Sequence, residues 1–284
     1  MLLRFTFIDK VVGEQNFDAI TPVDYSDVEA PTVLNVPVHF HDQIEIIECH
    51  ASGTYYLDDK VYNYNPGDII FCQAQKMHGW VGSTRGKYEG LIIDLKRLDP
   101  NNFDAHDSEL RAFYENKYAI PAVIRESDPA YESLKMRVSA LRTIVKENGG
   151  RLKMWGNAYL MLSEMAEGRK RNEAPIYNEQ AAAIKKSIEL MEKEYGGKVT
   201  TNEISDISGL SRYHFLMAFK AIAHSSPIDY LIDIRLTNAY YFLEHGYTVT
   251  DTSNLCGFNS LSYFILKFKE RYKITPHKVK ALTD

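Results

Sequence analysis

Four side chains in the first third of the chain could bind a metal ion or a polar small molecule. His39, His41 and Glu45 lie close together in the sequence, and His78 follows after several short apolar runs. In an extended strand every second side chain points to the same face, so the first three would share one face. Imidazole together with carboxylate is a ligand set for divalent transition metals. The same groups could instead hydrogen-bond a hydroxylated ligand or one another, and the sequence leaves these alternatives open.

The residues around these four are typical of short β-strands. Apolar runs such as Ile44–Ile47 and Ile69–Phe71 alternate with turn signals such as Pro66-Gly67-Asp68 between about residues 5 and 95. This pattern predicts the hairpins of a β-barrel or a β-sandwich. Three aromatic residues in the same region could stack against an apolar face of a sugar: Tyr55, Trp80 and Tyr88.

The C-terminal third contains an internal repeat. Thr200, Glu203, Ser205, Ile207, Gly209 and Leu210 recur at one constant offset as Thr248, Asp251, Ser253, Leu255, Gly257 and Phe258. After one inserted residue, Phe215, Phe219, Lys220 and Pro227 recur as Phe264, Phe268, Lys269 and Pro276. In each copy a threonine with an acid three residues later predicts a capped helix start, and the glycine predicts its end. The repeat therefore predicts two helix-turn-helix units.

The second helix of each unit should bury one stripe and leave the other free. Its phenylalanines are spaced i,i+4, which predicts that they pack inward. We expect the opposite stripe to contact DNA through Arg212, Tyr213, Leu216, Met217 and Lys220 in the first unit and through Ser260, Leu261, Ser262, Leu266 and Lys269 in the second. A helix over about residues 227–243 would space the units rigidly, and a duplex offers successive major-groove faces roughly 34 Å apart. A plain helical bundle is the alternative for a single unit, and the duplication favours DNA binding.

Charge and composition argue against non-specific nucleic-acid binding and against a membrane protein. The net charge of −5 argues against indiscriminate binding to polyanions. The acidic excess lies in residues 1–175, whereas a basic edge, which includes Lys267, Lys269 and Arg271, ends the second unit. No stretch approaches a membrane span, and the opening apolar run is too short for a signal peptide, which predicts a cytoplasmic protein. The three cysteines lack metal-type spacing, as expected for reduced structural thiols.

Residues from about 184 to 280 resemble the DNA-binding domain of the AraC/XylS family of bacterial transcription regulators. The resemblance rests on Cys256–Phe264, Phe268-Lys269 and Thr275-Pro276, and in the first unit on Ser208–Ser211, Phe219-Lys220 and Ser226–Leu231. Many members carry arginine where this chain has Met217 and Leu266, so we expect unusual base recognition, with a thymine methyl as one target. The glycine usual before each Ser/Thr-Pro is replaced by His224 and Lys273, which predicts strained turns.

The N-terminal part resembles the small cupin barrel that serves as the sensor in many of these regulators. The resemblance covers about 90 residues and rests on His39–Glu45, Asn65–Ile70 and His78. Cupin enzymes hold a metal with a comparable set, whereas a sensor can use the same residues on its effector. We expect effector contacts from His39, His41, Glu45, Tyr55, His78, Trp80 and Tyr88, and no bound metal or other cofactor.

The resemblance implies a two-domain α+β chain. Residues 1–171 would form a cupin-like β-barrel with following helices, residues 172–178 a polar linker that contains proline, and residues 179–284 an all-α double helix-turn-helix domain. In related regulators the helices after the barrel pair with those of a second subunit, which implies a homodimer.

The expected function is therefore that of a non-enzymatic transcription regulator, an activator in most resembling proteins. Its partners would be promoter DNA, a small-molecule effector, expected to be a carbohydrate, and RNA polymerase, with no membrane association. Two other readings stay open. One is a metal-dependent cupin enzyme, an isomerase or a dioxygenase, with an accessory helical module; the other is an architectural DNA-binding protein without an effector.

Overall fold

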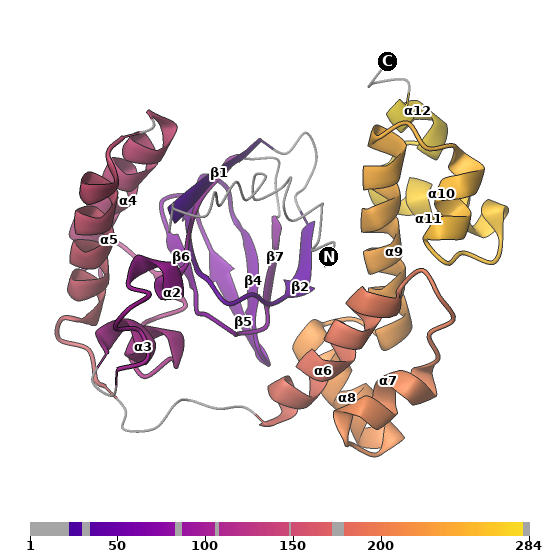
Figure 1. Ribbon diagram of the computed structural model, residues 1–284, viewed down its shortest axis with the longest axis horizontal. Coiled ribbons are helices and arrows are strands. Elements are labelled where there is room, and N and C mark those ends of the chain that lie inside the picture. The colour runs from indigo at the N-terminus through magenta and orange to yellow at the C-terminus, as the bar shows by residue number, and fades with distance from the viewer. Residues whose placement is uncertain are drawn as a thin grey trace. The chain divides into compact units, whose positions relative to one another are not determined.

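The computed structural model describes residues 23–29, 35–82, 87–105, 108–147, 149–171 and 179–280. They form two compact units that divide between Asn178 and Glu179. The first unit combines antiparallel sheets with helices, and the second is entirely helical in its described part (Figure 1). The predicted two-domain α+β architecture is confirmed. The predicted linker, residues 172–178, lies outside the described residues.

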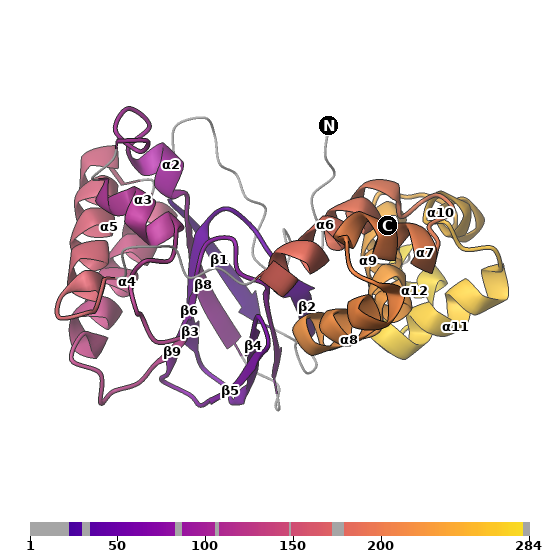
Figure 2. The same ribbon diagram turned by 90° about the horizontal axis from the view of Figure 1, so that it is seen from below.

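The N-terminal unit is built on two antiparallel sheets (Figure 2). The first contains, in order, β1 (Val23–Glu29), β8 (Lys87–Ile93), β3 (Ile44–Cys49), β6 (Ile69–Cys72) and β9 (Val123–Ile124). The second contains β2 (Asn35–His39), β7 (His78–Gly82), β4 (Gly53–Leu57) and β5 (Lys60–Tyr64). The Tyr55 hydroxyl on β4 donates to the Phe71 carbonyl on β6 at 3.5 Å, so the two sheets face each other.

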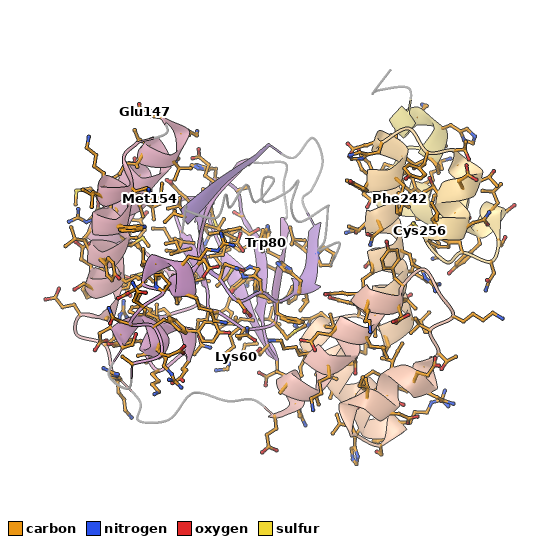
Figure 3. All side chains as sticks on the ribbon, viewed as in Figure 1. Lys60, Trp80, Glu147, Met154, Phe242 and Cys256 are labelled. Carbon is orange, nitrogen blue, oxygen red and sulfur yellow. The ribbon has the colours of Figure 1, made fainter. Side chains whose placement is uncertain are left out.

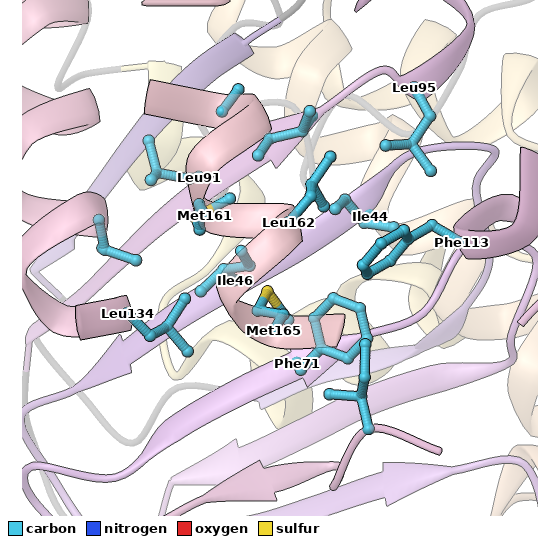
Figure 4. Packing of buried hydrophobic residues seen from close by; sticks show 14 of the residues in the cluster. Ile44, Ile46, Phe71, Leu91, Leu95, Phe113, Leu134, Met161, Leu162 and Met165 are labelled. Atoms are coloured by element: carbon cyan, nitrogen blue, oxygen red, sulfur yellow. The ribbon is translucent and has the colours of Figure 1, made fainter. Parts of the chain in front are cut away.

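Helices cover the outer face of the first sheet. These are α2 (Leu95–Leu98), α3 (Glu109–Tyr114), α4 (Tyr131–Lys146) and α5 (Arg151–Ala166). Ile46 on β3 and Phe71 on β6 share one core with Leu134 of α4 and Met161 and Met165 of α5 (Figure 4). The first sheet is therefore buried on both faces, and every residue of β3 and β6 except Glu48 is buried.

The C-terminal unit contains the two predicted helix-turn-helix modules. Its helices are α6 (Glu179–Glu194), α7 (Thr201–Ser208), α8 (Arg212–Ala223), α9 (Pro227–Glu244), α10 (Val249–Leu255), α11 (Leu261–Tyr272) and α12 (Pro276–Lys280). Thr200 and Glu203 form a complete capping box at the start of α7, and Thr248 caps α10 in the same way through the Asp251 amide. Ser211 and Ser260 cap α8 and α11, so the predicted helix starts are confirmed.

The strained turns predicted after each second helix are also present. His224 ends α8 with φ at 52°, and Lys273 ends α11 with φ at 61°. Both residues lie in the left-handed region, where a side chain costs conformational energy that glycine avoids.

Helix α9 connects the two modules and packs against both. Phe219 of the first module meets Tyr230 of α9 with ring centres 5.5 Å apart, and Phe268 of the second stacks on Tyr240 at 6.1 Å. Arg235, also on α9, donates to the carbonyls of Tyr195 and Gly197 at 2.8 and 2.9 Å. The turn between α6 and α7 is thereby held to the same central helix.

We predict that Gly257→Ala destabilises the protein more than Gly209→Ala. Both glycines have φ at 72°, so either alanine should lower the free energy of unfolding by roughly 1–2 kcal/mol through backbone strain. A Cβ on Gly257 would also lie 2.7 Å from the Tyr195 carbonyl oxygen, whereas nothing lies within 4 Å of one on Gly209. Crowding should add about 1–3 kcal/mol at Gly257 alone. Urea unfolding of the two variants checks this, and equal losses would contradict it.

Candidate nucleic-acid interface and sensor site

On α8 and α11, the predicted phenylalanine stripe is buried and the opposite stripe is exposed, as the sequence indicates. Phe215, Phe219, Phe264 and Phe268 are fully buried. All ten residues predicted to contact DNA are exposed: Arg212, Tyr213, Leu216, Met217 and Lys220 on α8, and Ser260, Leu261, Ser262, Leu266 and Lys269 on or next to α11. Each module therefore presents one free helix face, as a recognition helix must.

These two faces are unusually apolar for solvent-exposed helices. Tyr213 is 71% exposed, Met217 58% and Leu266 53%. Exposed apolar side chains that gather on one surface mark interaction sites more often than isolated ones do. Ile207 and Leu255 end α7 and α10 at equivalent positions and are exposed as well. The two residues occupy equivalent positions of the sequence repeat, but neither was predicted to contact DNA. An apolar residue repeated at the same exposed position of both modules is the signal that could have identified them.

The basic edge of the second module is smaller than its composition suggests. Lys269 and Lys278 are exposed. Arg271 is only 13% exposed and lies 3.5 Å from Asp233 of α9. Burial raises the pKa of Asp233, and the guanidinium of Arg271 acts in the opposite direction. Arg271 is thus engaged in fastening α11 to α9, so the expectation that it belongs to a phosphate-binding edge is wrong.

In the N-terminal unit, strands from both sheets bring the four predicted polar residues together. His39 on β2 pairs in register with His78 on β7, and Glu45 comes from β3 of the facing sheet. His41 lies in the turn between β2 and β3, so the prediction that His39, His41 and Glu45 share one face of a single strand is wrong, although the three side chains do converge. One potential ligand atom of each residue lies within 4.8 Å of those of the other three. His39, Glu45 and His78 are buried, and His41 is nearly so.

Backbone carbonyls orient the three imidazoles. Nδ1 of His39 lies 2.9 Å from the Pro37 carbonyl, Nδ1 of His41 2.9 Å from that of Gln43, and Nδ1 of His78 2.8 Å from that of Lys76. A carbonyl only accepts, so each Nδ1 must carry the proton and donate it. In the neutral rings Nε2 then presents a lone pair, and for His41 and His78 this atom lies 3.6 Å from Glu45 Oε2.

The electrostatics of the cluster keep Glu45 ionised. Burial alone would raise the pKa of Glu45, but its contacts with His41 and His78 outweigh burial and hold the pKa at about 2. Burial lowers the pKa of His39 and His78, and the neighbouring rings add to this effect. The cluster therefore places an anionic carboxylate among three imidazoles, of which His39 and His78 lose a proton more readily than a free histidine does.

The predicted aromatic contacts lie in the same interior, with one exception. Trp80, labelled in Figure 3, is two residues after His78 on β7 and so shares its face. Tyr55 of β4 pairs with Trp80 in register. Both are buried, and Trp80 Nε1 has no hydrogen-bond partner among the described residues. The Tyr88 side chain lies outside the described residues. Cys72, opposite Glu45 in register, was not foreseen as a neighbour of the cluster.

A second polar cluster lies on the first sheet and was not predicted. His50 Nε2 lies 2.9 Å from Glu89 Oε2. The Arg142 guanidinium of α4 reaches Glu89 at 2.5 Å and Glu48 at 3.3 Å. This cluster is neutralised by a cation of the chain itself, which the first cluster lacks among the residues described.

The known proteins to which the chain is similar include transcription regulators with a helix-turn-helix domain. The family described as "Helix-turn-helix domain" matches residues 204–281. The uncharacterized HTH-type transcriptional regulator YdeC of Bacillus subtilis (strain 168) is 22% identical over 96% of this chain and 99% of its own length. The HTH-type transcriptional activator RhaS of Mannheimia succiniciproducens is 23% identical over 90% of this chain and 96% of its own.

The solved structures to which the chain is similar include ToxT from Vibrio cholerae O395. It covers 92% of this chain and 98% of its own at 13% identity, with a TM-score of 0.47. An AraC-type regulator from Chromobacterium violaceum covers 36% of this chain and 92% of its own, at 24% identity and a TM-score of 0.35. Among the helices that the structure describes, none is long and apolar enough to cross a membrane.

Proposed function

We propose that the chain is a DNA-binding transcription regulator of the AraC/XylS type, as the helix-turn-helix match and the regulators among its relatives support. We further propose that it is an activator controlled by a small molecule that binds between its two N-terminal sheets. The observation that carries the DNA-binding part is the pair of capped helices, α8 and α11, with exposed faces on one central helix. α9 has 18 residues and so spans about 27 Å, comparable to the roughly 34 Å between successive major-groove faces.

We propose that the exposed apolar residues read bases. Met217 and Leu266 occupy the centres of their exposed helix faces, and in B-DNA the thymine methyl is the apolar group that the major groove presents. Lys220 and Lys269 follow Met217 and Leu266 by three residues and would contact phosphates. Specificity would then depend on methyl contacts more than on bidentate arginine contacts.

The sensing role rests on the polar interior of the first unit. Trp80 Nε1 and Gln43 Oε1 are buried and have no hydrogen-bond partner among the described residues, and burying such groups without one is costly. A hydroxylated ligand supplies both donors and acceptors, and the rings of Tyr55 and Trp80 suit the apolar face of a sugar. These features support a carbohydrate effector within a cupin-like sensor.

We propose that the effector acts by shifting a population of arrangements of a dimer. Met136 of α4 and Leu152 and Leu160 of α5 are exposed apolar side chains on neighbouring helices, which supports pairing with a second subunit there. A ligand that favours one arrangement raises its share, and that arrangement would place two DNA-binding units for promoter DNA and RNA polymerase. The location would be cytoplasmic, where the promoter is.

The enzyme alternative draws on the histidine-glutamate cluster. Regulators among the full-length relatives support a non-enzymatic function instead.

The thymine proposal predicts sensitivity to a single missing methyl. Binding sites would be selected from random duplexes, and each thymine then replaced by deoxyuridine. Loss of one buried methyl should weaken binding by about 0.8 kcal/mol, or roughly fourfold. At the thymine that the side chain contacts, the variant Met217→Ala or Leu266→Ala should bind the thymine and deoxyuridine duplexes equally. The control Val61→Ala, at an exposed apolar residue of β5, should keep the wild-type difference. Equal binding of both duplexes by the wild type would contradict the proposal.

The division of roles predicts a separable reader. A fragment from Ile176 to Asp284 keeps α6 to α12, so it should fold alone and bind the selected duplex. Sugars and sugar acids should not change the melting temperature of this fragment. In the full chain, an effector at 100 times its dissociation constant should raise the free energy of unfolding by about 2.7 kcal/mol. A thermal-shift screen compares the two. An unfolded fragment would contradict the proposed boundary, and an effector response in it would contradict sensing by the first unit.

A further inference from the structure

Residues 169–171, which directly precede the predicted linker, are docked on the rest of the N-terminal unit. Arg171 forms an antiparallel β-bridge with Tyr118. The main-chain amide of Ala119 donates to the carbonyl of Lys170 at 3.1 Å. The main chain is therefore fastened by strand-like pairing up to the point where the linker begins. We call residues 169–171 the docked segment.

Side chains add to this docking. One guanidinium nitrogen of Arg169 donates to both carboxylate oxygens of Asp128, at 2.6 and 2.7 Å, and both side chains are largely buried. Hydrogen bonds between ionised groups are stronger than those between neutral ones. Arg171 donates to Glu109 of α3 at 2.7 Å, but this pair is exposed and contributes less. Arg169 is therefore the principal side-chain anchor of the docked segment.

Two hydrogen bonds connect the histidine-glutamate cluster to the residues on which this segment docks. The Gln75 amide donates to the carbonyl of His41, a member of the cluster, at 2.8 Å. The buried side chain of Asn116 donates to the carbonyl of Ala74 at 2.9 Å. Ala119, which binds the docked segment, follows Asn116 by three residues. A continuous series of contacts therefore runs from the cluster to the start of the linker.

Two residues of this series have backbone conformations that side chains disfavour. Gln75 has φ at 64° and Asn116 has φ at 57°, both in the left-handed region. Asn116 Oδ1 is also buried and has no hydrogen-bond partner among the described residues. Such unfavourable features persist only where the surrounding structure holds them, and they are common in segments that switch between conformations.

We propose that residues 73–75 and 116–119 relay displacements of the His41 turn to the docked segment. In the docked state this segment keeps its bond to Ala119 and its ion pair, and in the released state both are broken. A molecule that moves the His41 turn on binding would change the ratio of the two states. The regulatory role rests on the proposed sensing function. The coupling itself is tested without effector or DNA, so that either can fail alone.

Limited digestion of the full chain with trypsin measures release directly, because trypsin cleaves after lysine and arginine. Cleavage after residues 169–171 requires the released state, and its rate follows the population of that state when docking is fast. Asp128→Asn removes the ion pair and should speed this cleavage. Cleavage after Lys135, in the middle of α4, reports unfolding of the whole unit and is the internal reference.

A double-mutant cycle tests the coupling. His41→Ala frees the turn, and Asn116→Gly keeps the left-handed backbone but removes the bond to Ala74. Each should speed cleavage of the docked segment by at least about twofold, which corresponds to the smallest interaction energies within one network. Together they should speed it no more than Asn116→Gly alone, because the relay is already broken. The control His50→Ala, in the second cluster, should be cleaved as the wild type is.

Three results would overturn the relay. They are wild-type cleavage of His41→Ala, effects of the two substitutions that multiply fully in the double variant, and equal acceleration by His50→Ala and His41→Ala. Circular dichroism checks that each variant folds. His41→Gln or Asn116→Asp takes the place of a variant that does not.

Discussion

The packing of two aromatic pairs on one helix is the constraint on which the DNA-binding unit depends. Phe215 with Phe219, and Phe264 with Phe268, are buried in separate modules, yet Phe219 and Phe268 both pack on tyrosines of α9. Because close-packed interiors deform little, the two exposed faces keep one spacing and one relative orientation. The two modules therefore recognise two DNA segments only when these lie at one fixed distance along the duplex.

A comparable constraint shapes the N-terminal unit. Its first sheet packs on helices through residues such as Ile46 and faces the second sheet through Glu45, so one strand contributes to both the core and the polar cluster. A buried carboxylate among imidazoles is stable only when the surrounding charges are balanced. The rigid frame of strands explains how such a cluster can be held in advance of any ligand.

Local signals made much of this structure predictable. The helix caps, which are Thr200 with Glu203 in α7 and Ser260 in α11, involve residues at most three positions apart. The phenylalanines of each buried stripe are one helical turn apart. Both kinds of signal are local and could be recognised in the sequence. The shared strand face predicted for His39, His41 and Glu45 was wrong, because the chain turns between His39 and Ile44 and the residues converge from two sheets. The ion pair of Arg271 with Asp233 joins residues distant in sequence, and a count of basic residues could not reveal it. The carbonyl partners that set each imidazole tautomer depend on backbone geometry, which residue types alone do not specify.

The most direct test of the central claim, that α9 makes both modules read one duplex as a unit, is a spacing experiment. Methylation interference on a selected binding site would locate the two contacted major-groove segments, which should lie about one helical turn apart. Duplexes with about 5 or 10 base pairs inserted between these segments would then be compared with the parent. A rigid spacing predicts that either insertion reduces binding to the non-specific level. Full affinity after either insertion would show that the modules bind independently and would contradict the account.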